Sequence, residues 1–171
     1  RHQHRFYGLS YDPDREVLVT AGATEALAGA LLGLLDTGDE VVLFEPMYDS
    51  YQACISLAGA VPKPVTLRPP AYGFDVAELR AAITPKTKLL LINTPHNPTG
   101  WLMSRPEFLT LHRLVRENGL LLLSDEVYRE SEHDPADRLP AACDQGEYAI
   151  SLGVTSKTYG LAGLRIGWVA T

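Results

Sequence analysis

The chain has 171 residues, 46% of them hydrophobic and 21% charged, which is typical of a globular domain with a hydrophobic core. Its formal net charge of −6 without a basic cluster argues against a nucleic-acid partner, and no apolar run is long enough to span a membrane. The two cysteines and five histidines match no metal or redox spacing, so we expect buried thiols, no metal site and a cytoplasmic, reducing compartment. Because Arg1 lies within a charged stretch and Thr171 would close a strand, we also expect a piece of a longer protein.

The first half of the chain alternates between predicted strands and helices. In order, these are a strand at 17–20, a helix from 23 to about 35, a strand at 41–44, a helix from about 48 to 58 and a proline-containing extended segment at 61–67. In the second helix, Tyr48 and Tyr51 fall three residues apart and therefore on one face.

The second half continues with helices that carry capping signals. Asp75 and Glu78 have the spacing of an N-cap with a glutamate that returns to it, and Ser104 and Glu107 repeat this spacing. The other elements are a strand at 88–92, a helix from 104 to about 117, and strands at 120–123, 148–152 and 166–170, while 129–147 show no clear pattern. Strands that are apolar throughout and alternate with helices predict a three-layer α/β/α fold with a mostly parallel sheet.

Lys157 lies in a polar, glycine-rich loop that follows the predicted strand at 148–152. A lysine at this point suits a Schiff base, because partial burial helps its amine to lose a proton and the glycines let a flat cofactor approach the backbone. The alternative interpretation is an ordinary surface lysine in a loop.

Other polar residues also follow predicted strands, at the edge where an open parallel sheet binds ligands. They are the residues 22–24 after the first strand, Tyr48 after the second, Asn97 after the strand at 88–92 and Asp125 after the strand at 120–123. Arg165 joins this edge only if Ile166–Ala170 runs antiparallel to the other strands, which we predict. Each residue has an ordinary alternative as a turn, a cap, core or surface, but their gathering in the order that one cofactor needs favours a functional site.

The sequence as a whole resembles the class I and II aminotransferases, which are pyridoxal-phosphate enzymes of fold type I. The matching segments follow the family's order and spacing and lie at 17–26, 38–41, 45–48, 93–100, 124–128 and 156–168. The resemblance implies that residues 1–171 form the large cofactor-binding domain, without the N-terminal arm and the C-terminal small domain. It also implies a homodimer with shared active sites, pyridoxal 5'-phosphate as cofactor, and an amino acid and a 2-oxo acid as substrates.

The resemblance further implies roles for the residues at the matching positions. Lys157 would form an aldimine with the cofactor and then shuttle the proton of the substrate Cα. Asp125 would keep the pyridine nitrogen protonated, while Asn97 and Tyr128 would hydrogen-bond the phenolic oxygen. Tyr48 would stack on the ring. The predicted catalytic residues are therefore Lys157, Asp125 and Tyr128.

The cofactor's phosphate would lie over Ala23 and Thr24 at a helix N-terminus, with a hydroxyl from Ser156 and a bidentate charge pair from Arg165. One departure from the family is Val154, which stands three residues before the lysine where a serine or threonine is usual. Losing one neutral hydrogen bond costs about 0.5–1.5 kcal/mol, which is too little to abolish binding that a charge pair supports.

The predicted function is therefore a pyridoxal-phosphate-dependent aminotransferase that works by ping-pong transfer through the pyridoxamine form. Another enzyme with the same cofactor stays open, namely a C–S lyase, a decarboxylase or an arginine-type oxidase or cyclase. A regulator that binds the cofactor as an effector is a third alternative, although residues 1–16 show no end of a helix-turn-helix module. The substrate is also open, because in the family the arginine that grips its carboxylate belongs to the C-terminal domain.

Overall fold

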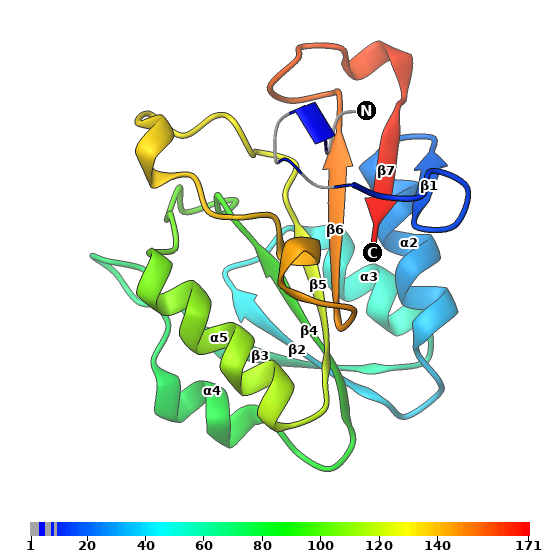
Figure 1. Ribbon diagram of the computed structural model, residues 1–171. Helices are drawn as coiled ribbons and strands as arrows, with labels where there is room; N and C mark the ends of the chain where they lie inside the picture. The colour runs from blue at the N-terminus through cyan, green and yellow to red at the C-terminus, as the bar shows by residue number, and fades with distance from the viewer. Residues whose placement is uncertain (1–3, 6–7, 9) are drawn as a thin grey trace.

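The computed structural model describes residues 4–5, 8 and 10–171, which are built around one seven-stranded sheet (Figure 1). The strands are β1 (Val17–Thr20), β2 (Glu40–Glu45), β3 (Val61–Thr66), β4 (Thr87–Asn93), β5 (Leu121–Asp125), β6 (Ala149–Val154) and β7 (Gly167–Ala170). They lie in the order β1-β7-β6-β5-β4-β2-β3. Strands β6, β5, β4, β2 and β3 are parallel, whereas β7 runs antiparallel to both its neighbours, as the sequence predicted.

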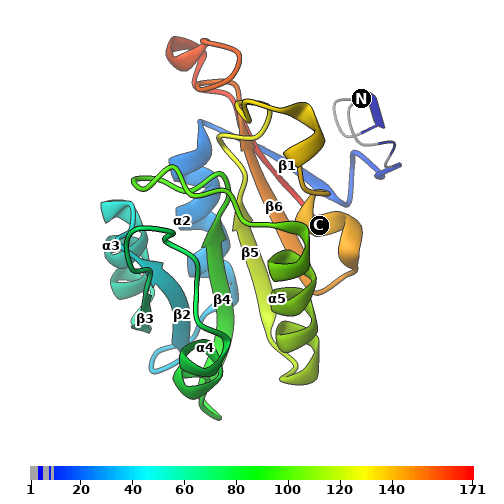
Figure 2. The same ribbon diagram turned by 90° about the vertical axis from the view of Figure 1, so that its left-hand side faces the viewer.

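Helices cover both faces of the sheet. They are α2 (Ala23–Leu34), α3 (Asp49–Leu57), α4 (Val76–Ala82) and α5 (Arg105–Glu117). Helices α2 and α3 lie on one face and α4 and α5 on the other, so the molecule has three layers (Figure 2). The predicted α/β/α class is confirmed.

Alternation along the strands supplies both apolar interfaces, because neighbouring residues of a strand point to opposite faces. In β2, Val41 and Leu43 belong to the core beneath α2 and α3, while Val42 and Phe44 belong to the core beneath α4 and α5. All four side chains are buried. Continuous apolar runs in the sequence therefore correspond to strands with cores on both sides.

The two capping signals have different outcomes. Ser104 and Glu107 form the complete capping box at the start of α5, with the side chain of each residue bonded to the backbone of the other. Asp75 caps α4 by accepting hydrogen bonds from the backbone of Ala77 and Glu78. The carboxylate of Glu78 does not return to Asp75 but pairs with Arg68 at 2.8 Å, so that half of the prediction is wrong. A long arginine nearby competes for a carboxylate that only local spacing assigned to the cap.

The irregular stretch at 129–147 contains two short 3-10 helices, η1 (Pro135–Asp137) and η2 (Ala142–Gln145), and a third, η3 (Ala162–Leu164), precedes β7. Strand β3 carries Pro62 and Pro64 at the edge of the sheet, where a residue without an N–H is tolerated. Within the described ranges, no helix combines the length and the hydropathy that a membrane crossing requires. Residues 1–3, 6–7 and 9, which bear on an upstream module, lie outside the described part.

Candidate active site

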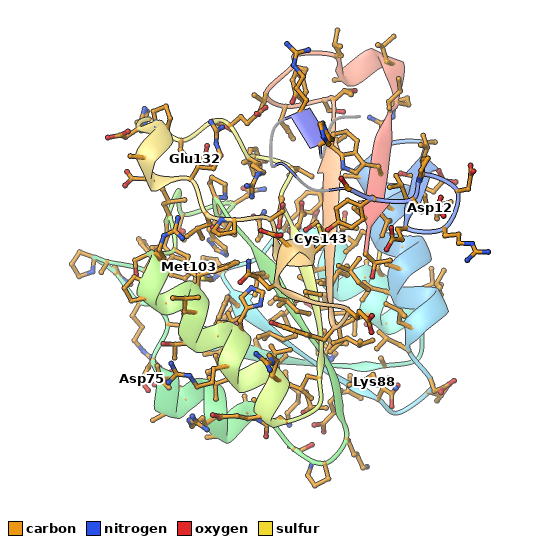
Figure 3. All side chains as sticks on the ribbon, in the orientation of Figure 1. Asp12, Asp75, Lys88, Met103, Glu132 and Cys143 are labelled. Atoms are coloured by element: carbon orange, nitrogen blue, oxygen red, sulfur yellow. The ribbon has the colours of Figure 1, made fainter. Side chains whose placement is uncertain are left out.

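The carboxyl ends of the parallel strands meet at one edge of the sheet, the upper edge in Figure 1, which we call the carboxyl edge. Because β7 is antiparallel, the loop at 155–166 between β6 and β7 rises above this edge. The predicted site residues all lie on β5 or on segments that leave or enter strands at the carboxyl edge. Lys88, at the start of β4, marks the opposite edge (Figure 3).

Asp125 is the last residue of β5 and its side chain is buried. Its Oδ2 accepts a hydrogen bond from the Tyr51 phenol at 2.6 Å, and its Oδ1 accepts one from the backbone N–H of Val127 at 3.2 Å. Burial raises the pKa of Asp125, while the hydrogen bonds from Tyr51 and Val127 and the charge of Lys157 act in the opposite direction by favouring the anion. A buried carboxyl with a donor on each oxygen suits a partner that carries a positive charge.

Lys157 lies close to both other predicted catalytic residues. Its Nζ is 5.2 Å from the centre of the Tyr128 ring, and its charge is near enough to act on the carboxyl of Asp125. The amine and the acid therefore lie on the same side of the carboxyl edge. The Lys157 side chain is exposed, so the partial burial that the sequence predicted is not supplied by the described residues.

The residues that follow Lys157 are held by hydrogen bonds to the segment after β5. The Thr158 hydroxyl donates to the carbonyl of Arg129 at 2.7 Å, and the Tyr159 phenol donates to the Glu130 carboxylate at 2.7 Å. The lysine loop is thereby fixed to the chain that carries the acid and the predicted phenol.

Asn93, at the end of β4, connects two predicted site residues. Its Oδ1 accepts a hydrogen bond from the backbone N–H of Asn97 at 2.7 Å, and its Nδ2 donates to the carbonyl of Asp125 at 2.9 Å. Asn93 is buried. Asn97 and Tyr128 both line an open cavity of about 370 Å³ that continues to Glu132, which is labelled at the upper left of Figure 3.

Gly22 and Arg165 form a tight corner at the start of α2. Gly22 is the N-cap residue, with φ of 89°, and it has no side chain to cap the N–H groups of the first turn, where Ala23 and Thr24 lie. A Cβ at Gly22 would come within 2.3 Å of Arg165 Nη2, and a Cβ at Gly167 would come within 2.5 Å of the Gly22 carbonyl carbon. Only glycine leaves room here for the Arg165 guanidinium next to the backbone N–H groups of the first turn of α2. A guanidinium and free N–H groups together suit an anion. We call this corner the anion seat.

Ser156, the residue before Lys157, has a hydroxyl that a ligand could bind. Its Oγ is buried and has no hydrogen-bond partner among the residues that the structure describes. Buried hydroxyls are rarely left without a partner, so this hydroxyl is free to bind a water molecule or a ligand oxygen. Val154 is buried at the end of β6, and the hydroxyl of Thr155 donates to the carbonyl of Ile166 at 3.2 Å. The hydroxyl that the family usually supplies three residues before the lysine is therefore absent here.

Tyr48 stands at the N-cap of α3 and is 41% exposed. Its ring packs against the ring of Tyr51 at 5.7 Å between centroids, with an interplanar angle of 83°. Tyr48 therefore packs on the residue whose phenol binds Asp125, and it keeps enough exposed surface to contact a ligand.

Three buried polar residues at this edge have roles that the sequence did not assign. The sequence put Tyr51 on the same helix face as Tyr48, and it put Asn93 at the start of a matching segment and Glu126 directly after Asp125. None of these positions indicates which group the side chain would hydrogen-bond. Glu126 Oε1 accepts hydrogen bonds from the backbone of Ala142 at 2.7 Å and from Ser151 at 2.9 Å.

Glu126 thereby secures the irregular stretch at 129–147 to the sheet, since Ala142 begins η2 and Ser151 lies in β6. Burial raises the pKa of Glu126, and the charge of Arg129 at 3.4 Å opposes the rise. The neighbouring Cys143 on η2 lies near the centre of the view in Figure 3. Its side chain and that of Cys54 are both buried, as predicted.

The chemistry of these groups fits one kind of ligand. The carboxyl edge offers an amine, a buried carboxyl and a phenol around Lys157, and the anion seat around Gly22. The anion seat and the unpartnered Ser156 hydroxyl fit the phosphate of pyridoxal 5'-phosphate, and the buried carboxyl fits a protonated ring nitrogen.

Known proteins with a similar sequence are named aminotransferases. A probable N-succinyldiaminopimelate aminotransferase of Mycobacterium tuberculosis is 44% identical over 170 residues, which cover 97% of this chain and 43% of the relative. A methionine aminotransferase of Escherichia coli is 37% identical over 167 residues, which cover 96% of this chain and 43% of the relative. The chain thus spans less than half of the length of these relatives.

Solved structures agree with the sequence relatives. The structure of N-succinyldiaminopimelate aminotransferase from Mycobacterium tuberculosis superposes with a TM-score of 0.92 at 42% identity, over 98% of this chain and 45% of that one. The family model for class I and II aminotransferases matches residues 1–171. The chain therefore belongs to the class I and II aminotransferase family.

Proposed function

We propose that the full-length protein is a pyridoxal-phosphate-dependent aminotransferase that moves an amino group between an L-amino acid and a 2-oxo acid, with residues 1–171 as part of its large cofactor-binding domain. Enzymes of this family use this cofactor. The observation that carries the proposal is the closeness of Lys157 to both Asp125 and Tyr128 at the carboxyl edge. An amine and a buried acid at the same edge of the sheet can act on one aromatic ring bound between them.

The bound cofactor supplies an electron sink that stabilises negative charge developing at the substrate Cα. Lys157 Nζ would accept the Cα proton as a general base and would return it as a general acid. Asp125 would hold the ring nitrogen of the cofactor through its carboxylate. Tyr128 Oη and the Asn97 side chain would hydrogen-bond the ring, and Tyr48 would provide an apolar contact.

Four residues would hold the phosphate of the cofactor. Arg165 would contribute a guanidinium, Ser156 a hydroxyl, and Ala23 and Thr24 backbone N–H groups at the positive end of the α2 dipole. Because the guanidinium carries a full charge, its contribution exceeds that of the hydroxyl missing at Val154.

Relatives named for N-succinyldiaminopimelate, methionine and kynurenine transamination support an amino-acid substrate with a 2-oxo acid as acceptor. The amino acids in these names differ in their side chains. Residues of the cavity beside Asn97 and Tyr128, together with the rest of the protein, would therefore select the substrate of this protein. We further propose a homodimer in the cytoplasm.

The proposal is tested by loading the full-length protein with cofactor and adding amino acids one at a time. We expect the visible absorbance of the bound cofactor to bleach and to recover on addition of a 2-oxo acid. Lys157→Ala should lower turnover by several orders of magnitude, because no other described amine lies beside Asp125. Lys88→Ala, at the opposite edge of the sheet, is the matched control and should behave as the wild type (Figure 3).

Two outcomes would contradict transamination. Normal turnover by Lys157→Ala would remove the proposed mechanism. Bleaching accompanied by release of ammonia or carbon dioxide, without recovery by a 2-oxo acid, would assign the protein to the lyases or decarboxylases that use the same cofactor.

A further inference from the structure

We propose that Tyr51 is a positioning residue of the active site, which holds the carboxylate of Asp125 ionised and directed at the ring nitrogen of the cofactor. This inference rests on the proposed function and adds to it a residue that does not itself touch the reacting atoms. It would make α3, an element of the outer layer, a support of the catalytic acid.

The contact is short, buried and long-range in sequence. The Tyr51 phenol donates to Asp125 Oδ2 at 2.6 Å, and the two residues are 74 positions apart. Tyr51 is 3% exposed and Asp125 is 7% exposed, so water competes little for this bond. The backbone N–H of Val127 also donates to this carboxyl, at the longer distance of 3.2 Å. The shorter of these two hydrogen bonds to Asp125 therefore comes from α3.

The balance of charge explains why the carboxyl needs this donor. Burial disfavours the anion of Asp125, and a hydrogen bond to the charged form is one of the few effects that can offset it. Tyr51 is a reliable donor because burial first, and the negative charge of Asp125 second, raise the pKa of its phenol well above the ordinary value. The proton therefore stays on the tyrosine, and the hydrogen bond that it makes favours the anion of Asp125 against the effect of burial.

The position of Tyr51 on α3 also fixes its direction. Tyr48 at the N-cap and Tyr51 in the first turn pack edge to face, at 5.7 Å between ring centroids. Ile55 and Cys54, further along the helix, are buried in the core beneath α2 and α3. The helix is thus held against the sheet by apolar packing, and its first turn presents the phenol to the end of β5.

The test uses the full-length holoenzyme with Tyr51→Phe, which keeps the ring and removes only the hydroxyl. We expect kcat to fall on the order of tenfold with little change in the KM for the amino acid, because the lost bond involves a charged group and does not contact substrate. The ¹⁵N resonance of the ring nitrogen in labelled cofactor should move toward the unprotonated value. This readout does not depend on turnover.

Tyr148→Phe is the matched control, because it removes a phenol from a hydrogen bond with His112 at 2.9 Å, away from the carboxyl edge. It should leave both readouts unchanged. Tyr51→Phe should also add little in an Asp125→Asn background, since two residues that act through one interaction are not additive.

The inference is overturned if Tyr51→Phe leaves the ring-nitrogen resonance unchanged, or if its effect on kcat is equally large in the Asp125→Asn background. Such results in an enzyme that Lys157→Ala inactivates would leave the proposed function intact. Turnover by Lys157→Ala would instead remove the proposed function, and the inference would then lose its basis.

Discussion

Gly22 occupies a place in the backbone where a side chain would meet a charged group. It has a positive φ of 89°, and a Cβ at this position would lie 2.3 Å from Arg165 Nη2. L-residues rarely adopt such a backbone, and holding one there costs about 1–3 kcal/mol. The glycine therefore serves two needs, the reversal from β1 into α2 and the close approach of the guanidinium.

Replacing this glycine tests both needs. Gly22→Ala should lower the free energy of unfolding by about 1–3 kcal/mol and should also weaken cofactor binding, because the methyl group displaces the guanidinium of Arg165. Gly29→Ala, within α2 and with open space at its Cβ position, is the control and should stabilise the protein by about 0.5–1 kcal/mol. Equilibrium unfolding and cofactor titration measure the two effects, and equal cofactor affinity in both variants would contradict the anion seat.

Helix α5 carries a buried histidine, His112, whose protonation at acidic pH favours the unfolded chain. The pKa of His112 is lowered to about 4 by burial, from an ordinary value of 6.5. Between pH 6.5 and about 4 the unfolded chain binds this proton and the folded chain does not. Stability should therefore decrease as the pH falls through this window, by up to about 1.4 kcal/mol per pH unit for this histidine. His96, whose pKa burial also lowers to about 4, acts in the same direction.

His112→Gln removes one of these groups and should make the loss of stability between pH 6.5 and 4 shallower. The variant should also be less stable than the wild type at pH 7, because it loses the hydrogen bond to Tyr148 and the packing against Phe108. Urea unfolding at several pH values measures both quantities. His133→Gln, an exposed histidine, is the control, and a slope that His112→Gln leaves unchanged would contradict the assignment.

At the scale of the whole molecule, the anion seat joins two ends of the chain. Gly22 follows β1, Arg165 precedes β7, and the two strands pair at one side of the sheet. A bound phosphate would connect these segments directly. Strand β1 has little other support, since Leu18 and Val19 are 62% and 70% exposed.

Cofactor binding should therefore slow amide hydrogen exchange in β1 and β7 of the full-length protein by on the order of tenfold or more, because binding stabilises local structure by mass action. Strand β3, at the other side of the sheet, should change much less. Arg165→Ala should abolish the difference. Equal slowing in β1 and β3 would show that the phosphate does not connect the ends.

Features that depend on local patterns could be predicted from the sequence. Apolar runs predicted the strands because each face of the sheet carries a core, and the Ser104 capping box formed because both partners lie within one turn. Polar residues placed after strands predicted the carboxyl edge, because parallel strands end at the same side. The antiparallel β7 followed from the requirement that Arg165 reach that side.

Partners distant in sequence were decided only by the tertiary structure. The donor to Asp125 is Tyr51, which comes from another layer, and Glu78 pairs with Arg68 although local spacing favoured its own helix cap. Asn93 and Glu126 likewise find partners on other strands and loops. Side-chain hydrogen bonds are set by distances that arise when layers pack, whereas periodicity reports only which face is apolar. The sequence by itself therefore determined the layers and the edge that carries the site, and packing decided which groups support the catalytic acid.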